Sequence, residues 1–333
     1  MIIKKLFLII SLLIGTSKSF SQTPGVRNGH NMVYYAPSKS ILLFGGADEA
    51  KVNGDTWSFS ADKWTRITDD GPSPRTFPCM VMADNYVLLF GGNAVLFGSD
   101  KNPIHCLDDT WKFQYGAWKE LAVNIHPDAR AEAAVAYNPS RKKVVLFGGR
   151  KAGGKWVVGD TWEFDGNQWN QVETYGPTPR SGAIMVYDAQ LKQIVLFGGN
   201  PVIAKEKDYN GPMWSWNGKN WNSMDSKVPL IFNSCMAYNI NENFILRFGG
   251  WNGQKRVNDT WIYKNKEWKK LHLKNAPVAR NHSIMIYNSE KNSFFLYGGH
   301  DGENIFGDMW EFKNRKWTLL FEEPSRKRLE NGH

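Results

Sequence analysis

The feature that most constrains the fold of this chain is a unit of about 50 residues that occurs six times. Each unit contains an aromatic residue followed by two glycines, and the steps between these motifs are 46, 57, 50, 51 and 49 residues. The aromatic residues are Phe44, Phe90, Phe147, Phe197, Phe248 and Tyr297. A repeat of this length is the signature of an architecture in which each unit buries its faces against its neighbours. The chain is therefore expected to consist of six similar units.

Two tryptophans follow each glycine pair and stand seven residues apart in every unit. The pairs are Trp57 and Trp64, Trp111 and Trp118, Trp162 and Trp169, Trp214 and Trp221, Trp261 and Trp268, and Trp310 and Trp317. A constant gap predicts a hairpin of fixed length. Each unit contains four short apolar runs of strand length, separated by Asn, Gly, Pro, Ser and Lys. No segment has the pattern of a long helix.

Four strands in a repeated unit of this size are typical of the blades of a β-propeller. The Phe-Gly-Gly and Asp-Thr-Trp motifs resemble those of the kelch repeat family, in its exported bacterial form. The resemblance covers roughly residues 24 to 320. It implies an all-β fold, a six-bladed kelch-type β-propeller with four antiparallel strands in each blade. Such a fold hosts many functions, so the motifs predict the architecture and leave the activity open.

The first 21 residues have the features of an export signal. Lys4 and Lys5 precede an apolar run of about ten residues, and Ser19 and Ser21 stand three and one positions before a cut at Gln22. The apolar run is too short to cross a bilayer, which takes about twenty residues, and no later stretch approaches that length. We therefore expect cleavage before Gln22, no membrane span, and a periplasmic or secreted protein.

The expected domain organisation has three parts: a signal peptide at residues 1–21, the propeller at 22–321 and a short C-terminal tail at 322–333. The six blades are expected at approximately residues 24–68, 72–122, 126–173, 177–225, 229–272 and 277–321. The tail copies the start of a repeat at Pro324 to Arg326, but no strand follows it. We expect a frayed end there and not a seventh blade.

Charge and motif content exclude several classes of function. The formal net charge is +9, and three lysines in the first 21 residues reduce it to about +6 for the remainder, too little to indicate nucleic-acid binding. No catalytic motif or Cys/His zinc spacing is present, so we expect no cofactor and no metal. Of the three cysteines, Cys79 and Cys235 belong to opposite blades and are expected to be unbonded to each other. We expect a monomer.

Loop lengths distinguish the two faces of the predicted disc. With the strands of each blade called A to D, the B to C loops and the connections between blades share one face, here named the B–C face. The A–B face is the opposite face, which carries the A to B and C to D turns. From the second glycine to the first tryptophan the steps are 11, 19, 13, 15, 11 and 11 residues. Insertions on one face of a repeat protein predict the binding face.

An arginine stands at one register near the start of each unit, except in the fifth, which has Ile231. The register arginines are Arg27, Arg75, Arg130, Arg180 and Arg280. The rigid fork of arginine suits a structural role, in which it ties loop carbonyls of adjacent blades together. The same residues are also candidates for a ring of positive charge that draws an anionic ligand to the channel. Both roles can hold at once, and Arg75, Arg130, Arg180 and Arg280 are predicted as ligand-binding residues.

Residues that the repeat does not explain are the other site candidates. Trp156 and Trp251 are large aromatics in B to C loops, where there is no core to fill. Two or three residues after the register arginine, the sequence differs from blade to blade and should line the channel mouth. The polar candidates there are Glu132, Asn233, His282 and His30, to which the loop residue His300 is added. His30, His282 and His300 come from adjoining blades 6 and 1, which favours a shared site.

Three functions remain open. The first is a non-catalytic recognition propeller that binds a glycan or a protein segment on the B–C face. The alternative is a sugar-modifying enzyme similar to the sialic acid mutarotases and epimerases, which are also exported six-bladed kelch propellers, with Glu132, His282 or His30 as general acid or base. That chemistry requires Glu132 and a histidine to converge on one pocket atom. The third is a structural component of a surface complex.

Overall fold

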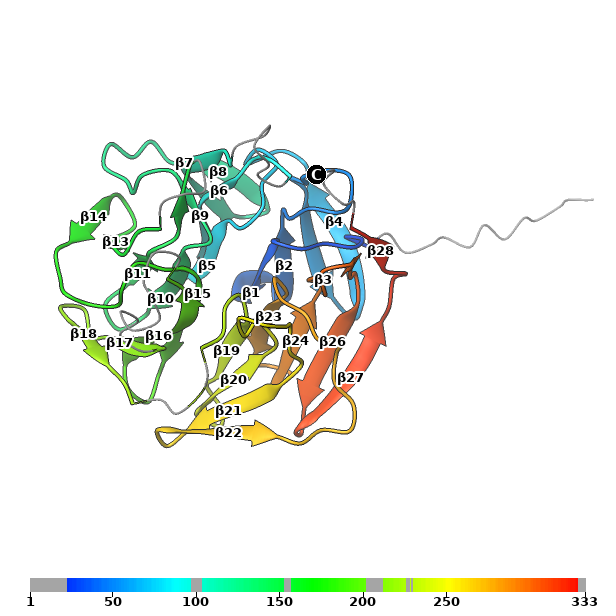
Figure 1. Cartoon of the computed structure of the whole chain (residues 1–333). Helices are drawn as coiled ribbons and strands as arrows, with labels where there is room; N and C mark the ends of the chain where they lie inside the picture. Colours follow the sequence, from blue (N-terminus) through cyan, green and yellow to red (C-terminus); the bar gives the residue numbers. More distant parts are fainter. Residues whose placement is uncertain are drawn as a thin grey trace, which may run out of the picture.

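The computed structural model describes residues 23–96, 104–152, 157–201, 212–225, 228 and 230–328. Six four-stranded antiparallel sheets are arranged around a central axis like the blades of a propeller (Figure 1). In each sheet the strands follow chain order, and strand A of each blade is the innermost. The predicted all-β, six-bladed propeller with four antiparallel strands per blade is confirmed.

The first three blades contain β1–β8, β10, β11, β13 and β14. Blade 1 comprises β1 (Asn31–Tyr35), β2 (Ser40–Phe44), β3 (Thr56–Ser60) and β4 (Lys63–Thr68), with the short 3-10 helix η1 (Ala36–Ser38) between β1 and β2. Blade 2 comprises β5 (Cys79–Ala83), β6 (Tyr86–Asn93), β7 (Cys106–Gln114) and β8 (Ala117–Glu120). Blade 3 comprises β10 (Ala134–Asn138), β11 (Lys143–Phe147), β13 (Thr161–Phe164) and β14 (Trp169–Val172).

The last three blades have the same arrangement. Blade 4 comprises β15 (Ser181–Asp188), β16 (Gln193–Asn200), β17 (Met213–Trp216) and β18 (Trp221–Ser223). Blade 5 comprises β19 (Cys235–Asn239), β20 (Phe244–Phe248), β21 (Thr260–Lys264) and β22 (Glu267–Leu271). Blade 6 comprises β23 (Ile284–Asn288), β24 (Ser293–Tyr297), β26 (Met309–Lys313) and β27 (Lys316–Phe321).

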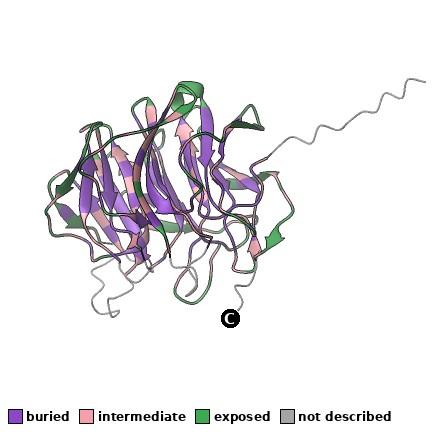
Figure 2. Ribbon diagram, turned by 90° about the horizontal axis from the view of Figure 1, so that it is seen from above, coloured by how far each residue is buried: buried purple, intermediate pink, exposed green. Residues whose placement is uncertain are grey.

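Burial follows the sequence pattern of each strand. Strand B is mostly apolar because both of its faces pack against neighbouring blades, and residues 194–197 of β16 are 0% exposed. The outer strand D alternates: in β4, Trp64 is buried while Lys63 and Thr65 are exposed. Figure 2 shows the result as buried strands inside the disc and exposed turns at its edges.

The glycine pairs join each blade to the next. Gly198 has a φ of +72°, and a Cβ atom there would lie 2.2 Å from the backbone oxygen of Ile231 in blade 5. The following N–H, that of Gly199, donates to the same oxygen at 3.1 Å. Only glycine permits both this backbone conformation and this close approach. The pair therefore marks the point at which two blades bond through their main chains.

The ring closes between blades 6 and 1 without exchange of a strand. Gly299 N–H donates to the Arg27 backbone oxygen at 2.8 Å, and Arg27 N–H donates to the Phe306 oxygen at 2.9 Å. The hydroxyl of Tyr297 donates to the backbone oxygen of Gly25 at 2.7 Å. Each four-stranded sheet is built from one continuous part of the chain, so the closure is made by the same kind of bond as the other blade junctions.

The second tryptophan of a blade donates its indole N–H to a threonine of the preceding blade at four junctions. The bonds are Trp118 to Thr56, Trp169 to Thr110, Trp221 to Thr161 and Trp317 to Thr260, at 2.9 to 3.1 Å. At the other two junctions Met213 and Met309 stand at the threonine position. Among the described residues the indole nitrogens of Trp268 and Trp64 then have no hydrogen-bond partner.

This difference predicts unequal costs for one substitution. Trp169→Phe deletes a buried hydrogen bond and leaves the Thr110 hydroxyl unpaired, whereas Trp64→Phe removes an N–H that has no partner among the described residues. We expect Trp169→Phe to lower the free energy of unfolding by about 1 kcal/mol more than Trp64→Phe. Urea denaturation of both variants measures the difference. Equal losses would show that the threonine bond contributes nothing to the junction.

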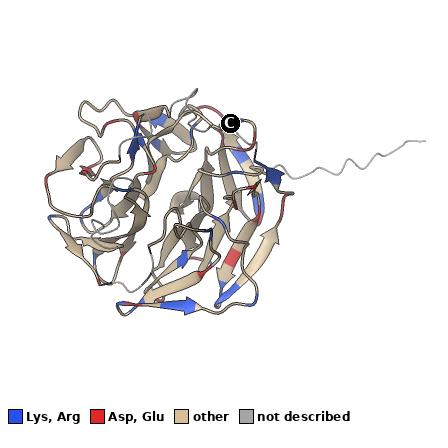
Figure 3. Ribbon diagram, viewed as in Figure 1, with Lys and Arg blue, Asp and Glu red and all other residues tan. Residues whose placement is uncertain are grey.

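The C-terminal tail is ordered at residues where the sequence predicted fraying. β28 (Arg326–Lys327) pairs with β25 (Asn304–Ile305) in the B to C loop of blade 6, and Arg326 forms an ion pair with Glu49 at 2.7 Å. The prediction of a frayed end is therefore wrong for these residues, because β25 offers a backbone edge on which the tail can add a strand. Figure 3 shows β28 as a basic segment. Among the described residues the tail forms no seventh blade.

Two further expectations can be compared with the structure. All three cysteine thiols are free and buried, so the prediction that Cys79 and Cys235 are not bonded to each other is confirmed. Within the described residues, no helix is long and apolar enough to span a bilayer. The expected signal peptide lies outside the described residues.

Candidate functional site

One residue from each blade contributes to a closed ring of backbone hydrogen bonds on the propeller axis. The six residues are Gly29, Phe77, Glu132, Gly182, Asn233 and His282. Each N–H donates to the carbonyl oxygen of the preceding member at 2.6 to 3.4 Å, and Gly29 completes the circle by donating to His282. All six have φ between 51° and 63°, a conformation that is strained for side chains such as those of Phe77 and Glu132. The residues that were predicted to line the channel mouth therefore narrow the central channel with their main chain.

An axial cavity of about 490 Å³ lies between this ring and the A–B face. The inner strands line it, and a tyrosine near the end of strand A stands at the far end in every blade except blade 2, which has Met82. Several of these hydroxyls tie blades together. Tyr137 donates to Asp84 at 2.6 Å, and the hydroxyls of Tyr187 and Ser140 lie 2.7 Å apart. The cavity is therefore a tube that runs from the closed backbone ring to these tyrosines.

Two of the predicted histidines meet at the B–C end of this tube. His282 Nδ1 and His300 Nε2 lie 2.9 Å apart, and the ring of Phe77 packs edge-on against His282 with centroids 4.8 Å apart. Burial, with nearby arginine charges, lowers the pKa of His282 to about 3. Burial, the neighbouring His282 and two arginines lower the pKa of His300 to about 2. Both imidazoles are therefore neutral near pH 7.

The third predicted histidine has different neighbours. His30 is 1% exposed and packs edge-on against Tyr297, with ring centroids 5.5 Å apart. Burial and the charge of Arg27 lower the pKa of His30 to about 3. Neither ring nitrogen has a hydrogen-bond partner among the described residues. Its contacts are those of a packing residue at the junction of blades 6 and 1.

The remaining polar candidates also have defined neighbours. The carboxylate of Glu132 lies 3.6 Å from Nε of Arg150, which belongs to the short strand β12 (Arg150–Lys151) paired with β9 (Arg130–Ala131). The side chain of Asn233 lies over Gly182, where a Cβ atom would stand 1.9 Å from Asn233 Oδ1. Both residues are partly exposed at the B–C end of the axis.

One of the two predicted loop tryptophans lies in the described part of the chain. Trp251 is half-buried, forms β-bridges with Phe232 and Arg256, and has the Arg256 guanidinium 5.1 Å from its ring centroid. One surface of the indole is therefore covered by a cation. Trp156 lies outside the described residues.

The register arginines are buried, with at most 3% of each exposed. All five N–H groups of Arg75 have acceptors: the Ser73 oxygens, the Gly91 carbonyl and both oxygens of Asp109. Arg27, Arg130 and Arg280 form the equivalent bidentate pairs with Asp55, Asp160 and Asp308. All of these side-chain bonds stay within one blade. The prediction that the arginine side chains tie adjacent blades together is therefore wrong. It is the backbone carbonyl groups of the arginines that accept hydrogen bonds from the neighbouring blade. A ligand-binding role of these residues stays a prediction.

The buried aspartates make stability sensitive to acid. Burial by itself raises the pKa of Asp55, but hydrogen bonds and charge from Arg27 outweigh it, so the pKa lies below its usual value. Asp109 and Asp160 have lowered pKa values for the same reasons. The stabilisation is complete above the unfolded-state pKa of about 3.9 and is lost as pH falls through the lower folded-state value. We expect the melting temperature to fall steeply below about pH 4, and less steeply in Asp160→Asn, as measured by calorimetry between pH 3 and 7.

Three arginines that the sequence did not single out act on His282 through their charge. Arg150, Arg256 and Arg328 all lower the pKa of His282 through their charge, although they come from blade 3, blade 5 and the tail. The positions of two of them in the sequence could have identified them, because Arg150 and Arg256 follow glycine pairs in B to C loops, outside the repeat register. Within the described residues, no three His, Cys, Asp or Glu side chains are grouped to hold a metal ion.

Comparison with known proteins agrees with this architecture. The KLHDC2/KLHL20/DRC7 Kelch-repeats domain matches residues 14–199 and again residues 142–328. An F-box/kelch-repeat protein of Arabidopsis thaliana is 29% identical over 183 residues, which are 48% of this chain and 36% of that protein. Kelch domain-containing protein 3 of Mus musculus is 27% identical over 186 residues, 50% of this chain and 46% of that protein. The chain thus spans less than half the length of these relatives.

The family match extends over most of the chain, and the repeats it covers are the blades seen in the structure. The glycine pairs, the strand C aspartates and the two tryptophans each have a defined contact in those blades. The chain therefore belongs to the kelch-repeat family of β-propellers.

Proposed function

We propose that this protein is a non-catalytic recognition propeller that binds a segment of a partner protein on the B–C face. The observation that carries the proposal is that non-repeat segments from separate parts of the chain meet at the B to C loop of blade 6. Arg256 of blade 5 donates to Asn281 Oδ1 at 3.0 Å, next to the His282–His300 pair, and β28 of the tail pairs with β25. A rigid scaffold with variable loops on one face is the usual design of a binding protein. Membership of the kelch family supports a protein partner.

Glycan binding through Trp251 has less support. Sugar rings stack on open indole faces, whereas the Arg256 guanidinium lies 5.1 Å from the Trp251 centroid. The mutarotase-like alternative needs a general acid or base that titrates near the working pH. Of the predicted general acids or bases, His282 and His30 have pKa values that burial lowers to about 3, so both imidazoles are poor proton donors and acceptors at neutral pH. A recognition role is therefore the better proposal.

We further propose that the chain is an exported kelch protein of the bacterial type, cut before Gln22 and periplasmic or secreted. The support is the sequence of residues 1–21, with two lysines, a short apolar run and small residues before the cut. N-terminal mass spectrometry of the protein recovered from the medium or periplasm tests this. A mature chain that still contains Lys4 and Lys5 would contradict it.

The binding face can be tested without knowledge of the partner. Peptides selected from a random display library on the folded protein should protect residues 251–257 and 300–305 from hydrogen exchange, and leave the A to B turns unprotected. Trp251→Ala should weaken peptide binding about thirtyfold, as expected when an interface aromatic worth about 2 kcal/mol is removed. The control is Tyr115→Ala, which removes a 91% exposed aromatic from a C to D turn on the opposite face. Protection confined to the A–B face would refute the assignment.

A further inference from the structure

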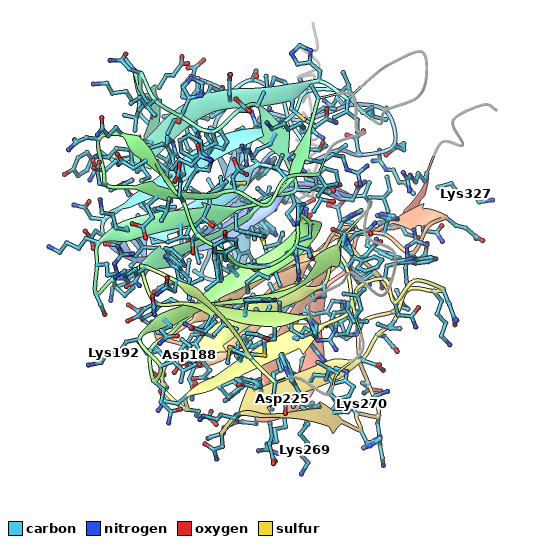
Figure 4. All side chains as sticks on the ribbon, turned by 60° about the vertical axis from the view of Figure 1, so that its left-hand side comes forward. Asp188, Lys192, Asp225, Lys269, Lys270 and Lys327 are labelled. Carbon is cyan, nitrogen blue, oxygen red and sulfur yellow. The ribbon has the colours of Figure 1, made fainter. Side chains whose placement is uncertain are left out.

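We propose that the A–B face contains a binding site for a small aromatic carboxylate, in a pocket between blades 5 and 6. This inference goes beyond the proposed function, because it concerns the opposite face and a small molecule. Asn292 lines the pocket and stands at the register of Lys192, which Figure 4 shows on the opposite side of the disc from Lys327. The cavity volume is about 260 Å³, slightly below the range of about 300 to 1,000 Å³ for pockets that hold drug-sized ligands, so it suits a single ring.

The floor of the pocket is apolar and aromatic. It is formed by four residues of one core cluster that spans blades 5 and 6: Phe244, Ile262, Phe294 and Phe312. Each of them is at most 8% exposed. The ring centroids of Phe244 and Phe294 lie 5.7 Å apart, and Phe312 packs edge-on against Phe294 at 6.2 Å. A planar aromatic ligand can continue this arrangement of ring edges and faces.

The rim of the pocket is polar and mostly cationic. It is formed by exposed residues of the A to B and C to D turns of blades 5 and 6. Among the described residues that line the pocket, three are cationic and one is acidic: Lys264, Lys313, Arg315 and Glu242. Lys264 Nζ donates to the backbone oxygen of Glu242 at 2.9 Å, which holds this ammonium group at the rim. The excess of positive charge favours an anionic ligand.

The equivalent space between blades 3 and 4 is filled by an ion pair. There the guanidinium of Arg141 pairs with the carboxylate of Glu163, with Nη2 and Oε2 3.0 Å apart. Glu163 Oε1 also accepts the indole N–H of Trp216 at 3.0 Å. A Cβ atom on Gly218 would lie 2.5 Å from Arg141 Nε, so the glycine makes room for the arginine.

Blades 5 and 6 have different residues at these registers. Glu242, Ile262 and Asn314 stand where blades 3 and 4 have Arg141, Glu163 and Gly218. Glutamate and isoleucine cannot form an ion pair. The pair that fills the space between blades 3 and 4 therefore has no counterpart at this junction, which is why a pocket forms here.

A small aromatic carboxylate matches both parts of the pocket. Its ring would pack on the phenylalanine floor, and its carboxylate would meet the cationic rim. An aliphatic acid lacks the ring, and a neutral aromatic compound lacks the charge. A guanidinium ligand, similar to the arginine of the other junction, would be repelled by three positive side chains and attracted by one carboxylate.

Benzoate, benzamide and acetate are the probes, titrated by ligand-observed NMR at constant ionic strength set with chloride. Benzoate should bind one site with a Kd of about a millimolar, as expected for a ligand of its size, and benzamide and acetate at least tenfold more weakly. Arg315→Gln should weaken benzoate binding at least threefold, and Glu242→Gln should strengthen it by a similar factor because it removes the opposing charge. The control Lys219→Gln removes the same charge as Arg315→Gln from the equivalent turn position of blade 4, beside the space that Arg141 fills, and should leave benzoate binding unchanged.

A triple variant tests the position of the site. Glu242→Arg, Ile262→Glu and Asn314→Gly together install the ion pair of blades 3 and 4 at this junction, and should abolish benzoate binding while the melting temperature stays within about 5 °C. Equal affinity for benzamide or acetate, unchanged benzoate affinity in Arg315→Gln, an equal loss in Lys219→Gln or weaker binding in Glu242→Gln would overturn the proposal. Peptide binding on the B–C face is measured separately, so failure there tests only the proposed function, and failure to bind benzoate tests only this pocket.

Discussion

Gly198→Ala is expected to lower the free energy of unfolding by about 3 to 5 kcal/mol. The φ of +72° costs an L-residue about 1 to 2 kcal/mol by itself. The larger part comes from the new Cβ atom, which would lie 2.2 Å from the backbone oxygen of Ile231. That oxygen is already bonded to Gly199 N–H, so the clash can be relieved only by separating blades 4 and 5. Guanidinium denaturation followed by tryptophan fluorescence measures the loss.

The matched control is Gly116→Ala, in the turn between β7 and β8. Gly116 has a φ of +84°, but a Cβ atom added there would meet no heavy atom within 4 Å. It should therefore show the backbone cost alone, about 1 to 2 kcal/mol. Equal losses for the two variants would mean that the close approach between blades is not what requires glycine at the junction.

Arg280→Met is expected to cost about 3 to 5 kcal/mol. The substitution keeps an apolar stem but removes the bidentate bond to Asp308, which is 7% exposed, and the donor to the Gly298 carbonyl. A carboxylate left buried without its partner is the main source of the loss. The double variant Arg280→Met with Asp308→Leu should recover part of it, because the unpaired charge is then gone. Denaturation curves for both variants give the comparison.

An exposed ion pair is the control for that prediction. Lys291 and Asp62 lie 3.1 Å apart with side chains 44% and 76% exposed. Lys291→Met should change the free energy of unfolding by less than about 1 kcal/mol, because water already screens the pair. A similar loss for Arg280→Met would show that the register arginines contribute little to the blades.

The fold could be predicted from the sequence because its constraints are local and recur in every blade. Among the described residues, the second glycine of five pairs and the indole of four second tryptophans bond to a neighbouring blade at equivalent positions. Because these contacts recur from blade to blade, the residues that make them recur in the sequence. The repeat also predicted which residues line the axis. Their closed circle of backbone hydrogen bonds could not be predicted, because the side chains at this position have no common type.

The candidate site was predicted only in part because it is built from what does not repeat. One shared site was predicted for His30, His282 and His300; His282 and His300 lie 2.9 Å apart, whereas His30 packs against Tyr297. Arg256 was missed, since its place in blade 6 depends on Asn281 and Gly302, which no repeat position specifies. Arg328 was missed because the pairing of β28 with β25 has no counterpart in the other blades.

The closure between the last and first blades has a topological consequence. Since no strand is shared across it, the bonds from Gly299 and Tyr297 to residues 25–27 hold the ring as the other junctions do. The chain could therefore be opened at another connection between blades and its present ends joined by a linker. Circular permutants of this kind should fold with the same blades in the same order around the ring, whichever connection is opened.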